Sequence, residues 1–111
     1  MKNPLKILCV IVDRTMEEKL LRALGKHVNF LHVAYGHGTA NSEVLAVLGI
    51  GEVGKAVLIG AVTEDNVEAV MKLLVDKFRF GSAGKGVAFT VPVTSVGGTV
   101  SLSVLCGKHL K

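Results

Sequence analysis

The chain has 111 residues, half of them hydrophobic, and a modest net charge of +4. This size predicts one domain spanning residues 1–111, and so apolar a composition excludes a disordered chain. Basic and acidic residues alternate in the N-terminal part, without a basic stripe interleaved with aromatic rings. The charge pattern therefore disfavours nucleic-acid binding, but it leaves a phosphorylated small molecule open as a ligand.

Three features of the sequence bear on the location of the protein in the cell. Residues 1–6 lead directly into an apolar run without a small-residue cleavage site, so we expect no signal peptide. No apolar run approaches the length of a membrane span, so we expect no membrane insertion. Cys9 and Cys106 lie in apolar runs without C-x-x-C spacing, which predicts buried, reduced thiols and a cytoplasmic location.

The first half of the chain predicts two strands around a helix. Residues 6–12 are apolar on both alternations, as in a strand covered on both faces. A helix follows, capped by Asp13 or Thr15 and stopped by Gly25 near Leu24. Its apolar stripe is Met16, Leu20, Leu21 and Leu24. Residues 28–35 form the second strand, with Phe30, His32 and Ala34 on one face and Leu31, Val33 and Tyr35 on the other.

The second half repeats this order. After a glycine loop and a short helical pattern at 43–48, residues 55–62 predict a third strand, and Thr63 is a good N-cap for the next helix. That helix has the clearest helical period, with Val67, Val70, Met71, Leu74 and Phe78 on one stripe. Residues 87–93 predict a fourth strand, at an edge or ending at Pro92. Alternation at 100–106, after Gly97 and Gly98, predicts a short fifth strand.

The repeated strand-helix-strand order predicts an α+β fold, a ferredoxin-like βαββαβ sandwich with a short extra C-terminal strand. Right-handed crossovers place both helices on one face of a four-stranded antiparallel sheet. Because the first and third strands are apolar on both alternations, the helix-free face would expose a large apolar patch. We therefore expect several copies of the chain to pack together through that face.

Two glycine turns are the candidate ligand sites, because backbone without Cβ atoms can approach a ligand closely. The first follows the second strand and the second precedes the fourth. The residues are Gly36, His37, Gly38 and Thr39 in the first turn and Gly84, Lys85 and Gly86 in the second. His37 either contacts a phosphate when protonated or lies in solvent. Lys85 is either a phosphate ligand or a solvated turn residue.

No arrangement in the sequence supports catalysis or a metal centre. The four histidines lack H-x-x-x-H and H-E-x-x-H spacing, and the acidic residues gather at helix starts, where they complement the helix dipole. We therefore predict that the protein is not an enzyme and has neither catalytic nor metal-ligating residues.

The element order and the two glycine turns together resemble the PII nitrogen-regulatory proteins. The motifs are Gly36-His37-Gly38-Thr39 after the second strand and residues 84–91, GKGVAFTV, at the start of the fourth. The resemblance implies a homotrimer with ATP or ADP between subunits. One subunit would contribute Gly36, Gly38 and Thr39, and its neighbour Gly84, Lys85 and Gly86. It also implies signalling in which the loop 36–54 docks onto a regulated partner protein.

Several positions depart from that family. The loop here is shorter than in the family, and its residues 40–54 lack tyrosine, so tyrosine nucleotidylylation has no target there. Val87 occupies the usual place of a phosphate-binding lysine, and residues 95–100 lack two expected arginines. Because each charge-assisted contact contributes about 1.5–3 kcal/mol, ATP binding would be weakened. Two alternatives stay open: a trimer that binds divalent metal ions, resembling the CutA proteins, and an oligomeric interaction module without a ligand.

Overall fold

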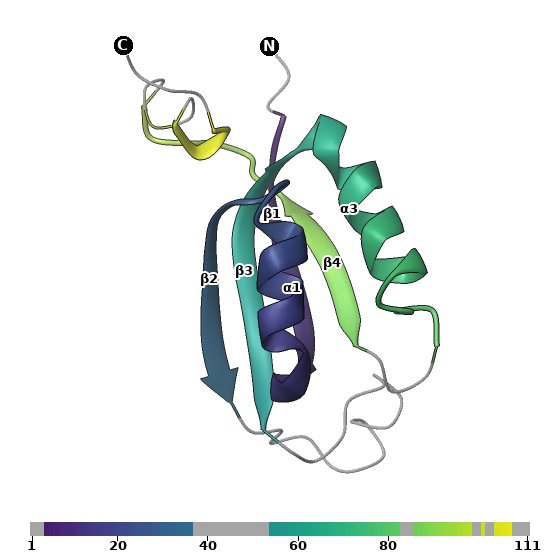
Figure 1. The fold of residues 1–111 in the computed structure, drawn as a ribbon. Helices are drawn as coiled ribbons and strands as arrows, with labels where there is room; N and C mark the ends of the chain where they lie inside the picture. Colours follow the sequence, from purple (N-terminus) through teal and green to yellow (C-terminus); the bar gives the residue numbers. More distant parts are fainter. Residues whose placement is uncertain (1–3, 37–53, 83–85, 99–100, 102–103, 108–111) are drawn as a thin grey trace.

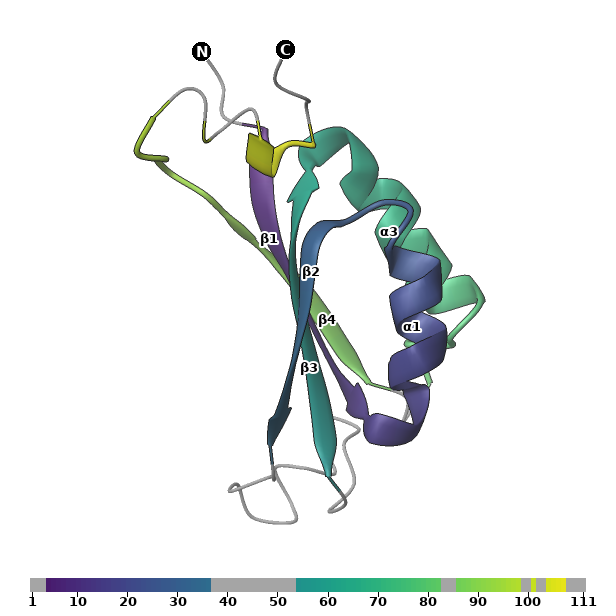
Figure 2. The same cartoon turned by 60° about the vertical axis from the view of Figure 1, so that its left-hand side comes forward.

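A computed structural model of the chain describes residues 4–36, 54–82, 86–98, 101 and 104–107. Four strands form an antiparallel sheet in the order β2-β3-β1-β4. The elements are β1 (Leu5–Asp13), the 3-10 helix η1 (Arg14–Met16), α1 (Glu17–Leu24), β2 (Asn29–Gly36), β3 (Lys55–Thr63), α3 (Glu64–Asp76) and β4 (Val87–Pro92). Both helices cover the same face of the sheet (Figures 1 and 2). The predicted α+β, ferredoxin-like arrangement is confirmed.

The core lies between the helices and the two central strands. Leu8, Val10 and Val12 of β1 are at most 1% exposed and point toward the helices. The predicted stripes of both helices face them: Leu20 and Leu24 of α1 are fully buried, and Val67, Val70, Met71, Leu74 and Phe78 all join the same cluster. Burying one such leucine stabilises the fold by about 1.5–3 kcal/mol, so these stripes hold the helices on the sheet.

The predicted helix caps are confirmed in part: Asp13 precedes η1 and Thr63 precedes α3, whereas the N-cap of α1 itself is Met16 and not Thr15. Asp13 is the N-cap of η1, yet its side chain accepts a hydrogen bond from Lys55 instead of a backbone N–H. Thr63 is the N-cap of α3, and its hydroxyl accepts from the Asn66 side chain at 3.3 Å. Gly25 ends α1 with an ordinary right-handed φ of −57°. Its N–H donates to the Leu21 carbonyl at 3.0 Å, so the stop there needs no left-handed residue.

The predicted fifth strand is wrong. Ser101, Val104 and Leu105 are helical, and the Gly107 N–H closes the turn by donating to the Val104 carbonyl at 2.9 Å. The three helical positions have the spacing i, i+3, i+4, so this segment fits a helix as well as a strand. The Asn29 side chain donates to the Leu105 carbonyl at 3.5 Å, which places the turn at the start of β2.

A bulge at the start of β2 depends on a glycine in the neighbouring strand. Pairing of β2 with β3 shifts register between Asn29 and His32, and Phe30 takes a φ of 53°. A Cβ on Gly60 of β3 would lie 2.3 Å from a Val28 methyl and 3.2 Å from the Asn29 carbonyl oxygen. Only a residue without a side chain fits there, so the bulge and Gly60 are a matched pair.

The chain after α3 turns through Arg79, which has a left-handed φ of 58°. Phe80 donates its N–H to the Leu74 carbonyl at 3.1 Å, and Ser82 donates to the Arg79 carbonyl at 2.8 Å. Glycine adopts this conformation without the steric conflict that a Cβ brings. The turn therefore holds an arginine where helix termination alone would favour glycine.

Replacing Arg79 with glycine is expected to raise the free energy of unfolding by about 0.5–1 kcal/mol. Relief of the left-handed strain, about 1–2 kcal/mol, exceeds the entropy that glycine adds to the unfolded chain, about 0.5–1 kcal/mol. Urea denaturation followed by circular dichroism measures the change. Arg79→Ala is the control, because it removes the guanidinium and keeps the strain. An equal gain in both variants would contradict the explanation.

The helix-free face of the sheet is apolar, as predicted. Across its middle, His32, Ile59, Cys9 and Phe89 lie side by side in adjacent strands. Ile59 is 42% exposed and Phe89 is 43% exposed, and Phe30 and Val91 are also exposed. Figure 2 shows the helices on the other side only. In the part of the chain that the structure describes, this apolar face has no cover.

Candidate functional site

Both glycine turns attach at one end of the sheet (Figure 1). The pairing register sets the order there: Gly36 is opposite Lys55, and Lys55 is opposite Asp13. On the other side of β1, Ile11 is opposite Val87, the first residue of β4. The turns leave from opposite edge strands, and three strand spacings separate those edges by about 14 Å. A ligand that touches both turns therefore spans the sheet or meets the second turn on another copy.

Gly36 and Gly86 are the predicted ligand residues that lie within the described ranges, whereas His37, Gly38, Thr39, Gly84 and Lys85 lie outside them. A Cβ on Gly36 would meet nothing within 4 Å, so packing does not demand glycine there. Gly86 differs, since its φ is +141° and a Cβ would lie 2.8 Å from a Val12 methyl and 3.0 Å from the Ile11 carbonyl oxygen. The backbone at Gly86 thus lies tightly against β1.

A buried ion pair joins β1 to β3 beside Gly36. Lys55 is only 4% exposed, and among the residues that the structure describes it is the only buried charged one. Its ammonium donates to the carboxylate of Asp13, whose side chain is 33% exposed. Sequence reasoning missed this pair, because it assigned Asp13 to helix capping. The signal that identifies it is the register, which places the last residue of β1 opposite the first residue of β3.

Arg14 contacts the chain on both sides of residues 37–53. Its guanidinium carbon lies 4.5 Å from the centre of the Tyr35 ring, a cation–π distance. Its backbone N–H donates to the Gly54 carbonyl at 3.3 Å, and a Cβ on Gly54 would lie 3.0 Å from its Nε. Sequence reasoning missed Arg14 too. This cation lies at the end of the sheet from which both glycine turns leave, where it can attract an anion.

Tyr35 links β2 to α1, because its hydroxyl donates a hydrogen bond to the Glu17 carboxylate. This hydrogen bond raises the pKa of Tyr35 above its ordinary value. Partial desolvation and the negative charge of Glu17 also raise it, and the positive charge of Arg14 opposes the shift. The neutral phenol is therefore the form that the folded chain favours.

Alkaline titration is expected to ionise the Tyr35 phenol at a higher pH in the folded chain than in the chain unfolded by urea. With the folded pKa raised, this stabilisation is complete below about pH 10, the ordinary pKa, and is lost as the pH rises through the folded value. Tyrosinate absorbance reports Tyr35 alone, since the chain has one tyrosine. Glu17→Gln should shift the folded midpoint toward the ordinary value, and an unchanged midpoint would contradict the assignment.

The described histidines and cysteines do not gather into a metal centre. Within the described ranges, no three His, Cys, Asp or Glu side chains come close enough to hold an ion. His32 is exposed on the helix-free face. Cys9 and Cys106 are free, as predicted, but each is half-buried rather than buried. Burial raises the pKa of the Cys9 thiol, which keeps it neutral near pH 7.

No described helix is long and apolar enough to cross a membrane.

No family model matches the chain, and no curated protein matches its sequence. Solved structures do match. CPII from Thiomonas intermedia K12, bound to ADP, AMP and acetate, superposes with a TM-score of 0.66 at 22% identity, over 90% of this chain and 96% of that one. Arabidopsis thaliana PII bound to citrate gives 0.62 at 22% identity, over 90% and 87%.

A putative PII-like signalling protein from Thermus thermophilus also matches, with a TM-score of 0.57 at 14% identity over 78% of this chain and 82% of that one. At identities this low, the structural matches establish a shared fold alone. The chain therefore has the fold of the PII-like nitrogen regulatory proteins, which confirms the resemblance at the level of architecture.

Proposed function

We propose that the chain is a divergent PII-like regulator, which acts as a homotrimer and binds an adenine nucleotide or another small anionic effector at the clefts between subunits. The observation that carries the proposal is the shared fold with CPII, a protein crystallised with ADP and AMP. The described ends of the two glycine turns, Gly36 and Gly86, lie at the same end of the sheet, which adds support. The protein would be a binding regulator and not a catalyst.

The trimer would form through the helix-free face. Its exposed apolar side chains, such as Ile59, Phe89 and Val91, need a cover of matching chemistry, and other copies of the same face provide it. Assembly would also bring the first turn of one copy near the second turn of another. The two turns, which one chain holds about 14 Å apart, would then line one cleft between subunits.

The effector site would consist of Gly36, His37, Gly38 and Thr39 from one subunit and Gly84, Lys85 and Gly86 from its neighbour. Arg14 is the described cation that best replaces the phosphate ligands missing from the family pattern, since it lies beside Gly54 and Tyr35. Lys55 is unsuited, because its ammonium is buried against Asp13. Arg14 would also report the effector to the loop 36–54, because it contacts both ends of that loop.

The output would be a change in partner binding through the loop 36–54, in keeping with regulation of nitrogen metabolism in the cytoplasm. Partner and effector would tune each other's affinity equally, as thermodynamic linkage requires.

Calorimetric titration of the assembled protein with ADP, AMP, ATP and divalent ions tests the proposal. We expect a nucleotide to bind, and Arg14→Gln and Lys85→Ala each to weaken its binding by about tenfold or more, since one charge-assisted contact contributes about 1.5–3 kcal/mol. Gly38→Val should weaken it as well, because a side chain there would block close approach of the backbone to the ligand. Arg22→Gln is the matched control, because Arg22 is exposed on α1 and paired with Glu18. Binding of metal ions alone would favour the CutA-like alternative, and no binding would favour the interaction module.

A further inference from the structure

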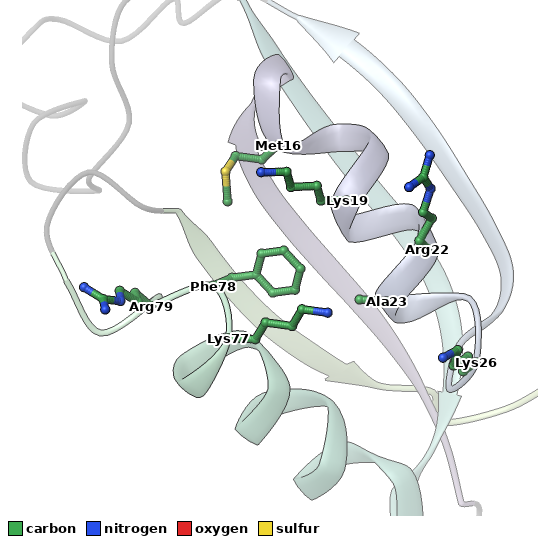
Figure 3. Close-up of a pocket in the computed structure, with 8 residues that line it drawn as sticks. All are labelled: Met16, Lys19, Arg22, Ala23, Lys26, Lys77, Phe78 and Arg79. Carbon is green, nitrogen blue, oxygen red and sulfur yellow. The ribbon is translucent and has the colours of Figure 1, made fainter.

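A basic hollow of about 880 Å³ lies on the helical side of the molecule, between α1 and the chain that follows α3 (Figure 3). Its floor is apolar and consists of Met16, Ala23 and Phe78. Five cations surround that floor: Lys19, Arg22, Lys26, Lys77 and Arg79. Among the residues that the structure describes, no carboxylate lines it. We call these eight residues the basic groove.

Most cations of the groove lack a partner of opposite charge. Arg22 is the exception and pairs with Glu18 at 2.7 Å on the exposed surface of α1. Within the described ranges of the chain, the other four cations form no ion pair. Phe78 is 6% exposed, so its ring closes the bottom of the groove. The groove therefore combines unneutralised positive charge with an apolar base, which suits a ligand with both negative and apolar groups.

Helix stability does not explain two of these cations. Lys19 lies in the first turn of α1, where the helix dipole disfavours positive charge. Arg79 holds a left-handed φ of 58°, where glycine would be unstrained. Lys77 is the C-cap of α3, where a cation complements the dipole and needs no further reason. Positions that depart from what stability favours are candidates for function.

The arrangement favours an extended occupant over a compact anion. Lys19 and Arg22 lie one turn apart on α1, and Lys26 lies in the turn that follows this helix, so the three cations form a row and not a cluster. Figure 3 shows the Phe78 ring in the middle of the groove, between Lys19 and Lys77, with Arg22, Lys26 and Arg79 toward the margins. The cations thus flank an apolar strip and do not converge on one point, as they would around a single phosphate.

We propose that the basic groove docks an acidic amphipathic helix of a partner protein. The apolar side of that helix would lie on Met16, Ala23 and Phe78, and its carboxylates would meet the cations on both sides. The groove lies on the opposite face of the sheet from Ile59 and Phe89, so it stays open when the helix-free face is covered. One chain contains all of it, and the nucleotide site has no part in it.

Fluorescence anisotropy with a labelled synthetic helix tests the proposal. The probe has leucines along one face and glutamates on both sides of them, and a scrambled peptide of the same composition is its control. We expect Lys77→Glu to weaken binding of the probe by about tenfold, through loss of attraction and added repulsion. The control variant Lys72→Glu, at an exposed position of α3 outside the groove, should change it less than about twofold.

Arg79→Gly should also weaken binding of the probe, although we expect it to stabilise the fold. Ile59→Glu, which places a charge on the helix-free face, should bind the probe as the unmodified protein does, which separates this proposal from that of the intersubunit nucleotide site. Equal weakening by Lys77→Glu and Lys72→Glu, or equal binding of the scrambled peptide, would overturn it. Tighter binding of a short DNA duplex or of phosphatidylserine vesicles than of the acidic helix would overturn it as well.

Discussion

Replacing Ile59 with glutamate is expected to reduce the mass of the assembled protein to that of one 11.7 kDa chain. Ile59 lies in the middle of the helix-free face, opposite Cys9 and His32 in the neighbouring strands, and is 42% exposed in one chain. In a trimer built on this face, three carboxylates would be buried together without partners. Burying each carboxylate would cost several kcal/mol, and the contacts of a trimer interface would not offset that cost.

Light scattering at micromolar concentration measures this mass. Val75→Glu is the matched control, because Val75 is an apolar side chain that is 52% exposed on the helix side, at α3. We expect that variant to keep the mass of the unmodified protein. A monomer before any substitution would refute the trimer, and an equal loss of mass in both variants would show that the helix-free face is not the interface.

Asp13→Ala is expected to lower the free energy of unfolding by about 3 kcal/mol. The substitution leaves the ammonium of Lys55, a residue that is 4% exposed, without its carboxylate. Breaking a buried pair in this way costs about 3–5 kcal/mol, and the lower end applies because one third of the Asp13 side chain reaches water. Urea denaturation of the two proteins measures the difference.

Lys55→Met provides the contrasting variant. Methionine keeps the apolar stem that packs in the sheet, and the remaining Asp13 carboxylate is exposed enough to stay hydrated. We expect this variant to lose less than about 1.5 kcal/mol, since replacing a buried ion by an apolar group of similar volume is often neutral. A larger loss in Lys55→Met than in Asp13→Ala would mean that the charge of Lys55 contributes little to the cost.

Local pattern was sufficient for the elements that form the core. The runs that became β1 and β3 and the stripe that became α3 each satisfied one period over many residues, and the structure has them with nearly the predicted bounds. Pro92 ends an edge strand, as predicted. The prediction for the segment after Gly98 was wrong because its few positions satisfy both the helical and the strand period. Its contact with Asn29, distant in sequence, favours the helical turn.

The candidate site was predictable only in part. The glycine turns are visible in the sequence, and their described ends lie at one end of the sheet, on the two edge strands, as the fold class predicts. The Asp13–Lys55 pair and the contacts of Arg14 depend on which residues stand opposite in the register, and a shift of one residue would place their side chains on the other face of the sheet. The basic groove likewise joins residues of α1 to residues after α3.

The sequence by itself determined the layers of this protein, because the hydrophobic period of each segment decides which side chains leave water. Only the tertiary structure decided which charges meet. Ion pairing and groove formation depend on distances of a few ångströms between segments far apart in the chain, and no local pattern specifies those distances. The same physics explains why the apolar helix-free face was foreseen and the basic groove was not.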